Sequence, residues 1–253
     1  MKIAIEIHPG HWINPGSGAS GILNEVTEAR RVAKRVYEIL KASKVPCTYY
    51  EDNSSTNQRQ NINYLVSQHN KDRDGLIVSI HFNSGGNSSK PIGTEVLYYD
   101  QQALAARISK AISVATGGGL LNRGAKQRLD LGVLASTYEP AILIEVCFVN
   151  STVDAAIYRR DFEKICTAIA KELAAYLGKT VPSTQSIEED KPTEKDDKMQ
   201  FSNETTQAAV REHIKQTVDK KLIDKSWLDK FDNGTMTSGD YEGLKLIIEQ
   251  RTK

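Results

Sequence analysis

The chain has few cysteines, little net charge and no long apolar run, and each shortage excludes a class of protein. Its three cysteines are odd in number and form no CxxC pair, so Cys147 and Cys166, which lie among apolar neighbours, are interpreted as small buried hydrophobic residues. No apolar run approaches the roughly 20 residues of a membrane-spanning helix. The alternating start at residues 1–7 is too short for a signal-peptide core, so we expect synthesis in the cytoplasm.

The charge of the chain is close to balanced, at +1 over 253 residues. Residues 1–180 carry +4, residues 181–198 carry −3 from six acids and three lysines, and residues 199–253 carry nine charges of each sign. Because neither the whole chain nor its C-terminal part is basic, we expect no nucleic acid and no anionic membrane as a partner. The hydrophobic content of 39% is ordinary for a globular protein.

Strand patterns alternate with helix patterns through residues 1–180. The expected strands are 2–7, 46–51, 75–82, 93–99 and 141–149, and the expected helices are 23–41, 58–70, 104–115 and 162–177. This alternation predicts an α/β domain of three layers, in which helices flank a largely parallel, twisted sheet.

The composition changes sharply after residue 180. Residues 181–198 are polar and acidic and contain prolines, which predicts a flexible linker. Residues 199–253 have apolar positions at helical spacing, which predicts a small all-α domain. Thr237 to Asp240 have the spacing of a capping box at the start of its last helix.

Two histidines stand at the ends of predicted strands. His11 follows the first strand, and His81 closes the apolar run 75–82. Ligands of open α/β sheets bind in the crevice beyond the carboxyl ends of the strands, so both residues are placed for a site. His8 is the local alternative to His11, and a histidine that closes an apolar strand is otherwise a core residue.

Two glutamates complete the candidate set. Glu25 shares a helix face with Val32, Val36 and Leu40, so it is expected to point inward, whereas Glu28 is the alternative that faces solvent. Glu145 lies inside an apolar strand, where an unpaired carboxylate must find a partner or carry a proton. Desolvation then raises its pKa toward the range of a general acid or base, and an ion pair with a lysine or arginine is the alternative.

The four residues suit a catalytic zinc site, because two histidines and one carboxylate leave a coordination position open. Polar residues expected at the rim of the same crevice are Asn83, Arg123 and Asp130.

Residues 1–180 resemble the zinc-dependent N-acetylmuramoyl-L-alanine amidases of bacterial autolysins and phage endolysins. The matching segments are Pro9-Gly10-His11, the helix that begins near Glu25, Ser79 to Asn83, Asn122-Arg123-Gly124 with Asp130 to Leu134, and Pro140 to Glu145 with Phe148 to Asn150. This chain departs from the usual family pattern at His8, where the family has aspartate, and at Val146-Cys147, where it has Leu-Gly.

The resemblance implies that His11, Glu25 and His81 bind one zinc ion and that Glu145 is the catalytic carboxylate. It further implies cleavage of the amide between N-acetylmuramic acid and L-alanine, with peptidoglycan as the partner and with action on the wall after release from the bacterial or host cytoplasm. A phage endolysin is the favoured role, and a sporulation or autolytic amidase is the alternative. Two other hypotheses are a non-catalytic wall-binding protein and a zinc peptidase that cuts another amide.

The resemblance does not cover residues 199–253. Their position predicts a wall-targeting module, and oligomerisation through Val210, Ile214 and Val218 is the alternative. Trp227, Phe231 and Tyr241 are expected in its core rather than on a sugar-binding surface.

Overall fold

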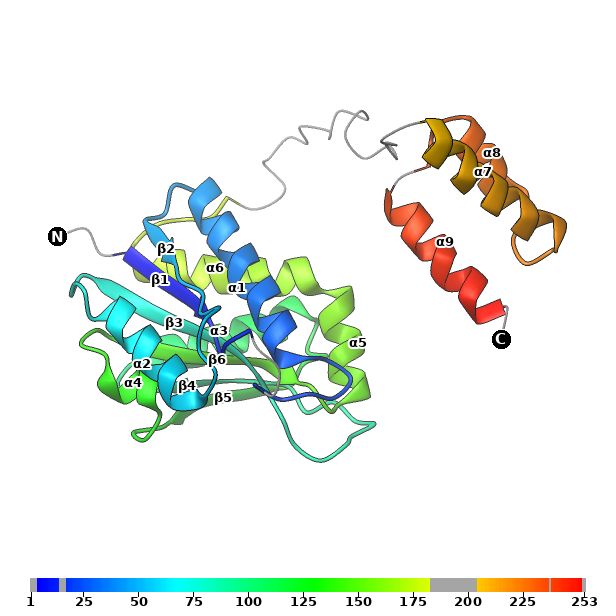
Figure 1. Cartoon of the computed structure of the whole chain (residues 1–253). Helices are drawn as coiled ribbons and strands as arrows, with labels where there is room; N and C mark the ends of the chain where they lie inside the picture. The colour runs from blue at the N-terminus through cyan, green and yellow to red at the C-terminus, as the bar shows by residue number, and fades with distance from the viewer. Residues whose placement is uncertain (1–3, 14–16, 183–203, 237, 252–253) are drawn as a thin grey trace. The chain divides into compact units, whose positions relative to one another are not determined.

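The computed structural model describes residues 4–13, 17–182, 204–236 and 238–251, and it divides the chain into two compact units, 1–182 and 183–253. Figure 1 shows the sheet and its flanking helices in the first unit and the helices of the second unit. The predicted linker lies almost wholly outside the described residues. No helix in the described ranges has the length and apolarity that crossing a membrane requires.

The first unit is built on a six-stranded mixed sheet. Its strands are β1 (Ala4–Pro9), β2 (Cys47–Tyr49), β3 (Gly75–Asn83), β4 (Thr94–Tyr98), β5 (Asn122–Gln127) and β6 (Ala141–Phe148). They lie in the order β2-β1-β3-β6-β4-β5, and every neighbouring pair is parallel except β4 with β6. The predicted fold class is therefore confirmed, with one antiparallel pairing inside the sheet.

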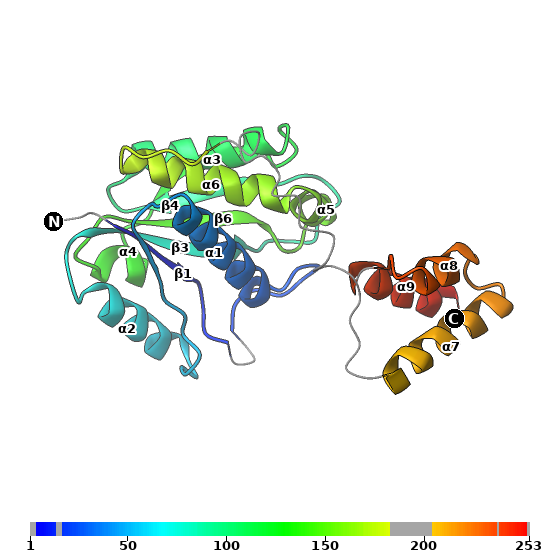
Figure 2. The ribbon, with the colours of Figure 1, turned by 90° about the horizontal axis from the view of Figure 1, so that it is seen from above.

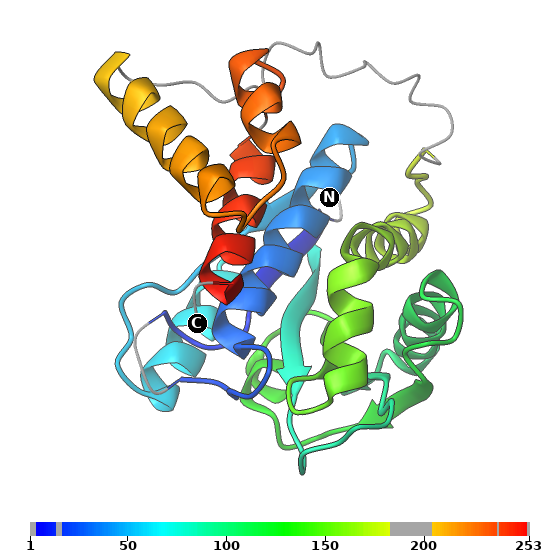
Figure 3. The same cartoon turned by 90° about the vertical axis from the view of Figure 1, so that its right-hand side faces the viewer.

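Helices cover both faces of this sheet. They are α1 (Glu25–Ala42), α2 (Gln58–His69), α3 (Gln102–Ala115), α4 (Gly132–Ser136), α5 (Thr152–Arg160) and α6 (Phe162–Tyr176). Figure 2 shows α3 and α6 on one side of the sheet and α2 with α4 on the other, and in Figure 3 α1, α5 with α6, and α3 stand side by side in blue, yellow-green and green. The central strands β3 and β6 are thus covered on both faces, which explains their nearly continuous apolar runs.

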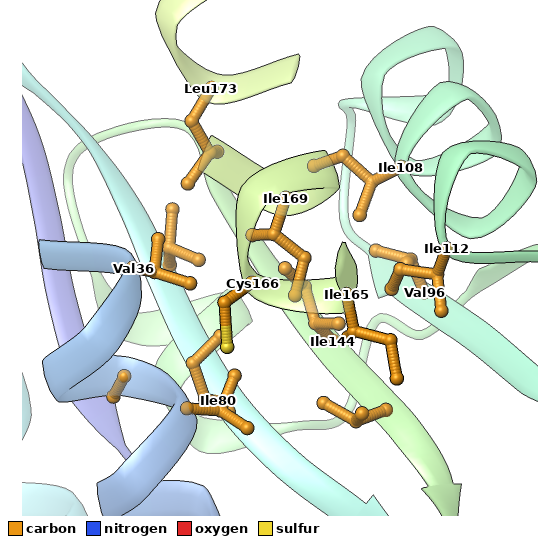
Figure 4. Packing of buried hydrophobic residues seen from close by; sticks show 14 of the residues in the cluster. Val36, Ile80, Val96, Ile108, Ile112, Ile144, Ile165, Cys166, Ile169 and Leu173 are labelled. Carbon is orange, nitrogen blue, oxygen red and sulfur yellow. The ribbon is translucent and has the colours of Figure 1, made fainter. Parts of the chain in front are cut away.

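The larger core lies between the sheet and the layer that contains α1, α3 and α6. Figure 4 shows Val36 of α1, Ile80 of β3, Ile144 of β6 and Ile169 of α6 converging there, and all four are fully buried. Cys166 and Cys147 belong to the same cluster and are buried free thiols, as predicted. A smaller cluster around Leu65 and Leu143 lies under α2 and α4.

Three elements were not predicted. Strand β5 (Asn122–Gln127) is polar, largely exposed and at the edge of the sheet, so it lacks apolar alternation. Helix α4 has five residues, and α5 has nine with only a short buried stripe, so neither shows a clear helical period.

The second unit contains α7 (Glu204–Asp219), α8 (Ser226–Asp232) and α9 (Ser238–Arg251). Ile214 and Phe231 are buried in its core, and Val210, Val218, Trp227 and Tyr241 pack against that core. The apolar face proposed for oligomerisation is therefore used inside the unit itself. The predicted capping residue Thr237 lies outside the described residues.

Candidate metal centre

His11 and His81 are brought together by the neighbouring strands β1 and β3. Pro9 pairs with Ile80 in the parallel register, and the Gly10 N–H donates to the Ile80 carbonyl at 2.7 Å just beyond that pair. His11 then adopts the left-handed conformation, with φ of 63°. Its ring centroid lies 4.9 Å from that of His81, nearly edge-on.

Glu25, the first residue of α1, joins the two histidines. Its Oε1 lies 3.2 Å from His11 Nε2 and 2.9 Å from His81 Nδ1. The three side chains form a cluster whose candidate ligand atoms all lie within 4.8 Å of one another. The sequence had favoured Glu25 over Glu28, and only Glu25 belongs to this cluster.

Backbone groups fix the Glu25 carboxylate in place. The Ala19 N–H donates to Oε2 at 2.6 Å, and the Phe82 N–H donates to Oε1 at 3.1 Å. Although burial alone would raise the pKa of Glu25, hydrogen bonds from His11 and His81 lower it well below its usual value. Burial lowers the pKa of His81, so its imidazole is neutral at physiological pH. An ionised carboxylate and neutral imidazoles are the states in which these groups bind metals.

The donor set fits zinc. Ligands at about 2.0–2.1 Å in a tetrahedral shell are roughly 3.3 Å apart, and the two separations from Glu25 Oε1 come within half an ångström of that. Two imidazoles and one carboxylate are also the donor set of catalytic zinc sites, whose fourth position stays open.

Gly10 is required by the close approach of the His81 ring. A Cβ at Gly10 would lie 2.1 Å from His81 Cε1 and 2.2 Å from its Nε2, far inside contact distance. The φ of Gly10 is not in the left-handed region, so its role is the space that it leaves for the His81 ring.

We expect Gly10→Ala to lower zinc affinity by about 10- to 100-fold, the range seen when the partners that orient a ligand are lost. The added methyl group must displace the His81 imidazole. Gly85→Ala is the matched control, because its Cβ would meet only the Phe148 ring at 3.6 Å. Competition with a chromogenic chelator measures both affinities, and equal values for the two variants would refute this role.

Glu145 lies on β6, between a histidine of β3 and a second glutamate on β4. It pairs with His81 across β3–β6 and with Glu95 across β4–β6, so all three lie side by side on neighbouring strands. Its Oε2 is buried and accepts no hydrogen bond from the described residues. Desolvation, with smaller contributions from the charges of Glu25 and Glu95, raises the pKa of Glu145 to about 8.

The raised pKa of Glu145 makes the stability of the folded protein depend on pH, and the Glu145→Gln variant tests this dependence. With the metal removed, the folded state holds the Glu145 proton up to about pH 8, whereas an unfolded glutamate loses it near pH 4.5. The folded state therefore binds more protons between these values, and Glu145 costs stability increasingly as pH rises through that window. We expect Glu145→Gln to raise the Tm of chelator-treated protein by about 5 °C at pH 8 and by almost nothing at pH 4.5. Glu38→Gln, at an exposed site, is the control. Any change in Tm that it causes should be the same at pH 8 and at pH 4.5.

The predicted rim residues divide into two groups. Asn83 Nδ2 and Arg123 Nε donate to opposite oxygens of Glu95, at 2.9 and 2.7 Å. Asp130 is exposed and forms an ion pair of two hydrogen bonds with Arg128. The positive charge of Arg128 lowers the pKa of Glu145 and so opposes part of the rise caused by burial. Glu95 and Arg128 were missed by the sequence reasoning, although Glu95 gives the same signal as Glu145, a carboxylate inside an apolar strand.

His8 is not part of the cluster. It is fully buried, and its Nδ1 lies 2.8 Å from Nε2 of His69, whose Nδ1 lies 2.6 Å from Glu6 Oε2. The structure thus gives His8 buried partners of its own, and the candidate zinc ligand at this strand end is His11.

The sequence matches one protein family, described as N-acetylmuramoyl-L-alanine amidase, over residues 5–175. An uncharacterized protein of Clostridium perfringens is 32% identical over 220 residues, which cover 83% of this chain and 60% of that protein. A second, 38.4 kDa protein of C. perfringens is 30% identical over 195 residues, which cover 72% of this chain and 54% of that protein. The chain therefore spans little more than half the length of these relatives.

Solved structures share the fold of the first unit. The catalytic domain of CwlV, an N-acetylmuramoyl-L-alanine amidase from Paenibacillus polymyxa, has a TM-score of 0.57 and 30% identity, covering 72% of this chain and all of that domain. The amidase AmiC2 of Nostoc punctiforme has a TM-score of 0.59 and 27% identity, with coverage of 71% and 99%. The catalytic domain of the CD27L endolysin, which targets Clostridia difficile, shares the fold with a TM-score of 0.61 at 24% identity, with coverage of 71% and 99%.

Proposed function

Because the chain belongs to the N-acetylmuramoyl-L-alanine amidase family, we propose that it hydrolyses the amide between N-acetylmuramic acid and L-alanine in peptidoglycan. One observation supports this most strongly. His11, Glu25 and His81 form a compact set of candidate metal ligands, and in the strand register Glu145 lies directly beside His81.

In this proposal the three ligands hold one zinc ion at the carboxyl ends of β1 and β3. When bound, zinc supplies a Lewis acid that polarises the amide carbonyl and lowers the pKa of water. Glu145 accepts the proton of the attacking water and passes it to the departing L-alanine nitrogen. Two observations support this role: its buried Oε2 accepts no hydrogen bond from the described residues, and Glu145 lies beside His81 in the strand register.

Analysis of digested cell walls tests the reaction. We expect purified chain to release muropeptides with a new N-terminal L-alanine and to leave the lactyl carboxylate on the sugar. A peptidase would cut the stem and leave the lactyl–alanine bond whole, and a non-catalytic binding protein would bind the wall and release nothing.

For the biological role, we propose a phage endolysin whose residues 1–180 are catalytic, whose residues 181–198 are a linker and whose residues 199–253 bind the wall. A sporulation or autolytic amidase is the alternative. A holin gene beside the coding sequence favours the phage role. Sedimentation of the full chain and of a version ending at residue 180 with purified walls tests the binding role, which fails if both sediment equally.

A further inference from the structure

Four carboxylates meet at the amino-terminal edge of the sheet, at the opposite end of the strands from the zinc ligands. Glu6 comes from β1, Asp72 and Asp74 from the turn before β3, and Glu139 from the segment just before β6. One oxygen of each lies within 4.8 Å of one oxygen of every other. Three chain segments thus bring four like charges together in one place.

In the described part of the chain, little neutralises these charges. Among the described residues, no lysine or arginine forms an ion pair with any of the four carboxylates. His69 pairs with one of them, through Nδ1 at 2.6 Å from Glu6 Oε2, and its Nε2 lies 2.8 Å from His8 Nδ1. Such a cluster costs free energy unless a cation or a proton compensates it.

Glu139 supplies an unused ligand atom inside the cluster. Its side chain is nearly buried, at 6% exposure, and its Oε1 accepts from the Gly75 N–H at 2.8 Å. Its Oε2 is buried and has no hydrogen-bond partner in the described part of the chain. A Cβ at Gly75 would lie 2.9 Å from this oxygen and 3.1 Å from Glu6 Oε1, so the two oxygens face the same small space above Gly75.

We propose that Glu6, Asp72, Asp74 and Glu139 bind a calcium ion. Calcium takes six to eight oxygen ligands at about 2.3–2.6 Å, so opposite oxygens of its shell are about 4.6–5.2 Å apart, and four oxygens that all lie within 4.8 Å of one another fit inside such a shell. The shell of magnesium spans only about 4.2 Å and demands stricter geometry. Asp72 is exposed and Asp74 half-buried, which leaves room for water to complete the coordination.

The competing explanation is a proton. Burial and the charges of Glu6 and Asp72 raise the pKa of Glu139, so a protonated Glu139 would also relieve the repulsion. The two explanations predict different effects of calcium on the stability of the folded protein. An ion that joins β1, the turn before β3 and the start of β6 binds the folded state and stabilises it, whereas a shared proton makes the protein indifferent to calcium.

Thermal unfolding of the full chain at neutral pH and constant ionic strength distinguishes them. We expect about 10 mM calcium chloride to raise the Tm of the first unit by about 5 °C, and the same concentration of magnesium chloride to raise it much less. Glu139→Gln and the exposed Asp72→Asn should each remove most of the calcium response. Asp100→Asn, which removes an exposed carboxylate elsewhere, and His11→Ala, which removes a proposed zinc ligand, should both keep it.

Three results would overturn the proposal. These are a wild-type Tm that does not change with calcium, an equal rise in Tm with magnesium, or a calcium-dependent rise in Tm that is kept in both Glu139→Gln and Asp72→Asn. Asp72→Asn keeps the test decisive if Glu139→Gln does not fold, because the Asp72 side chain is exposed and lies outside the core.

Discussion

We expect Glu145→Gln to reduce amide hydrolysis by about a thousandfold or more and to leave the zinc content unchanged. Glutamine keeps the size of the side chain but neither accepts nor returns the proton, and general acid–base catalysis contributes about 10²–10⁴-fold in enzymes. Zinc content stays the same because Glu145 is not among the three clustered ligands. Initial rates on purified walls, together with metal analysis of the same sample, measure both quantities.

Glu95→Gln is the control for this variant. Glu95 lies directly opposite Glu145 on β4, but its carboxylate already accepts from Asn83 and Arg123. A loss of no more than about tenfold is expected there. If Glu145→Gln kept more than a tenth of the activity, or if it lost its zinc, the role given to Glu145 would be wrong.

His81→Ala removes a proposed zinc ligand outright, so we expect it to lower zinc affinity by more than the 10- to 100-fold that loss of an orienting partner costs. Activity should fall to background at limiting zinc. The chain offers a clean comparison, because His213 is exposed on α7 and its replacement by alanine should leave zinc binding and hydrolysis intact. A zinc affinity in His81→Ala equal to that of the wild type would show that the metal binds elsewhere.

Much of the site was predictable because burial constrains charged groups so strongly. A glutamate inside the run 140–149 must be paired or reactive, and the helix period placed Glu25 on the buried face of α1. Both arguments use only local spacing. The same argument would have identified Glu95, which lies in the buried strand Thr94–Tyr98.

Contacts between distant segments were not predictable in this way. That Glu145 adjoins His81 depends on the strand order, in which β6 lies between β3 and β4 and is antiparallel to β4. The contact between Gly10 and the His81 ring depends on the same register. The acidic cluster joins residues 6, 72, 74 and 139, whose spacing in the sequence carries no periodic signal.

The polar edge strand β5 was missed for a different reason. Its residues are mostly exposed, so they need no apolar alternation, and its pairing with β4 fixes it as a strand. The alternation of apolar and polar residues that predicts a strand arises because one face of the strand is buried. An exposed edge strand has no buried face and so lacks this alternation.

X-ray absorption at the zinc edge of the purified full chain tests the proposed centre most directly. We expect one zinc per chain, with two histidine nitrogens at about 2.0–2.1 Å and oxygen ligands at about 2.0–2.2 Å. His81→Ala, reconstituted with excess zinc, should lose one of the two nitrogens. A sulfur ligand at about 2.3 Å, or a shell with no histidine nitrogen, would contradict a centre made by His11, Glu25 and His81.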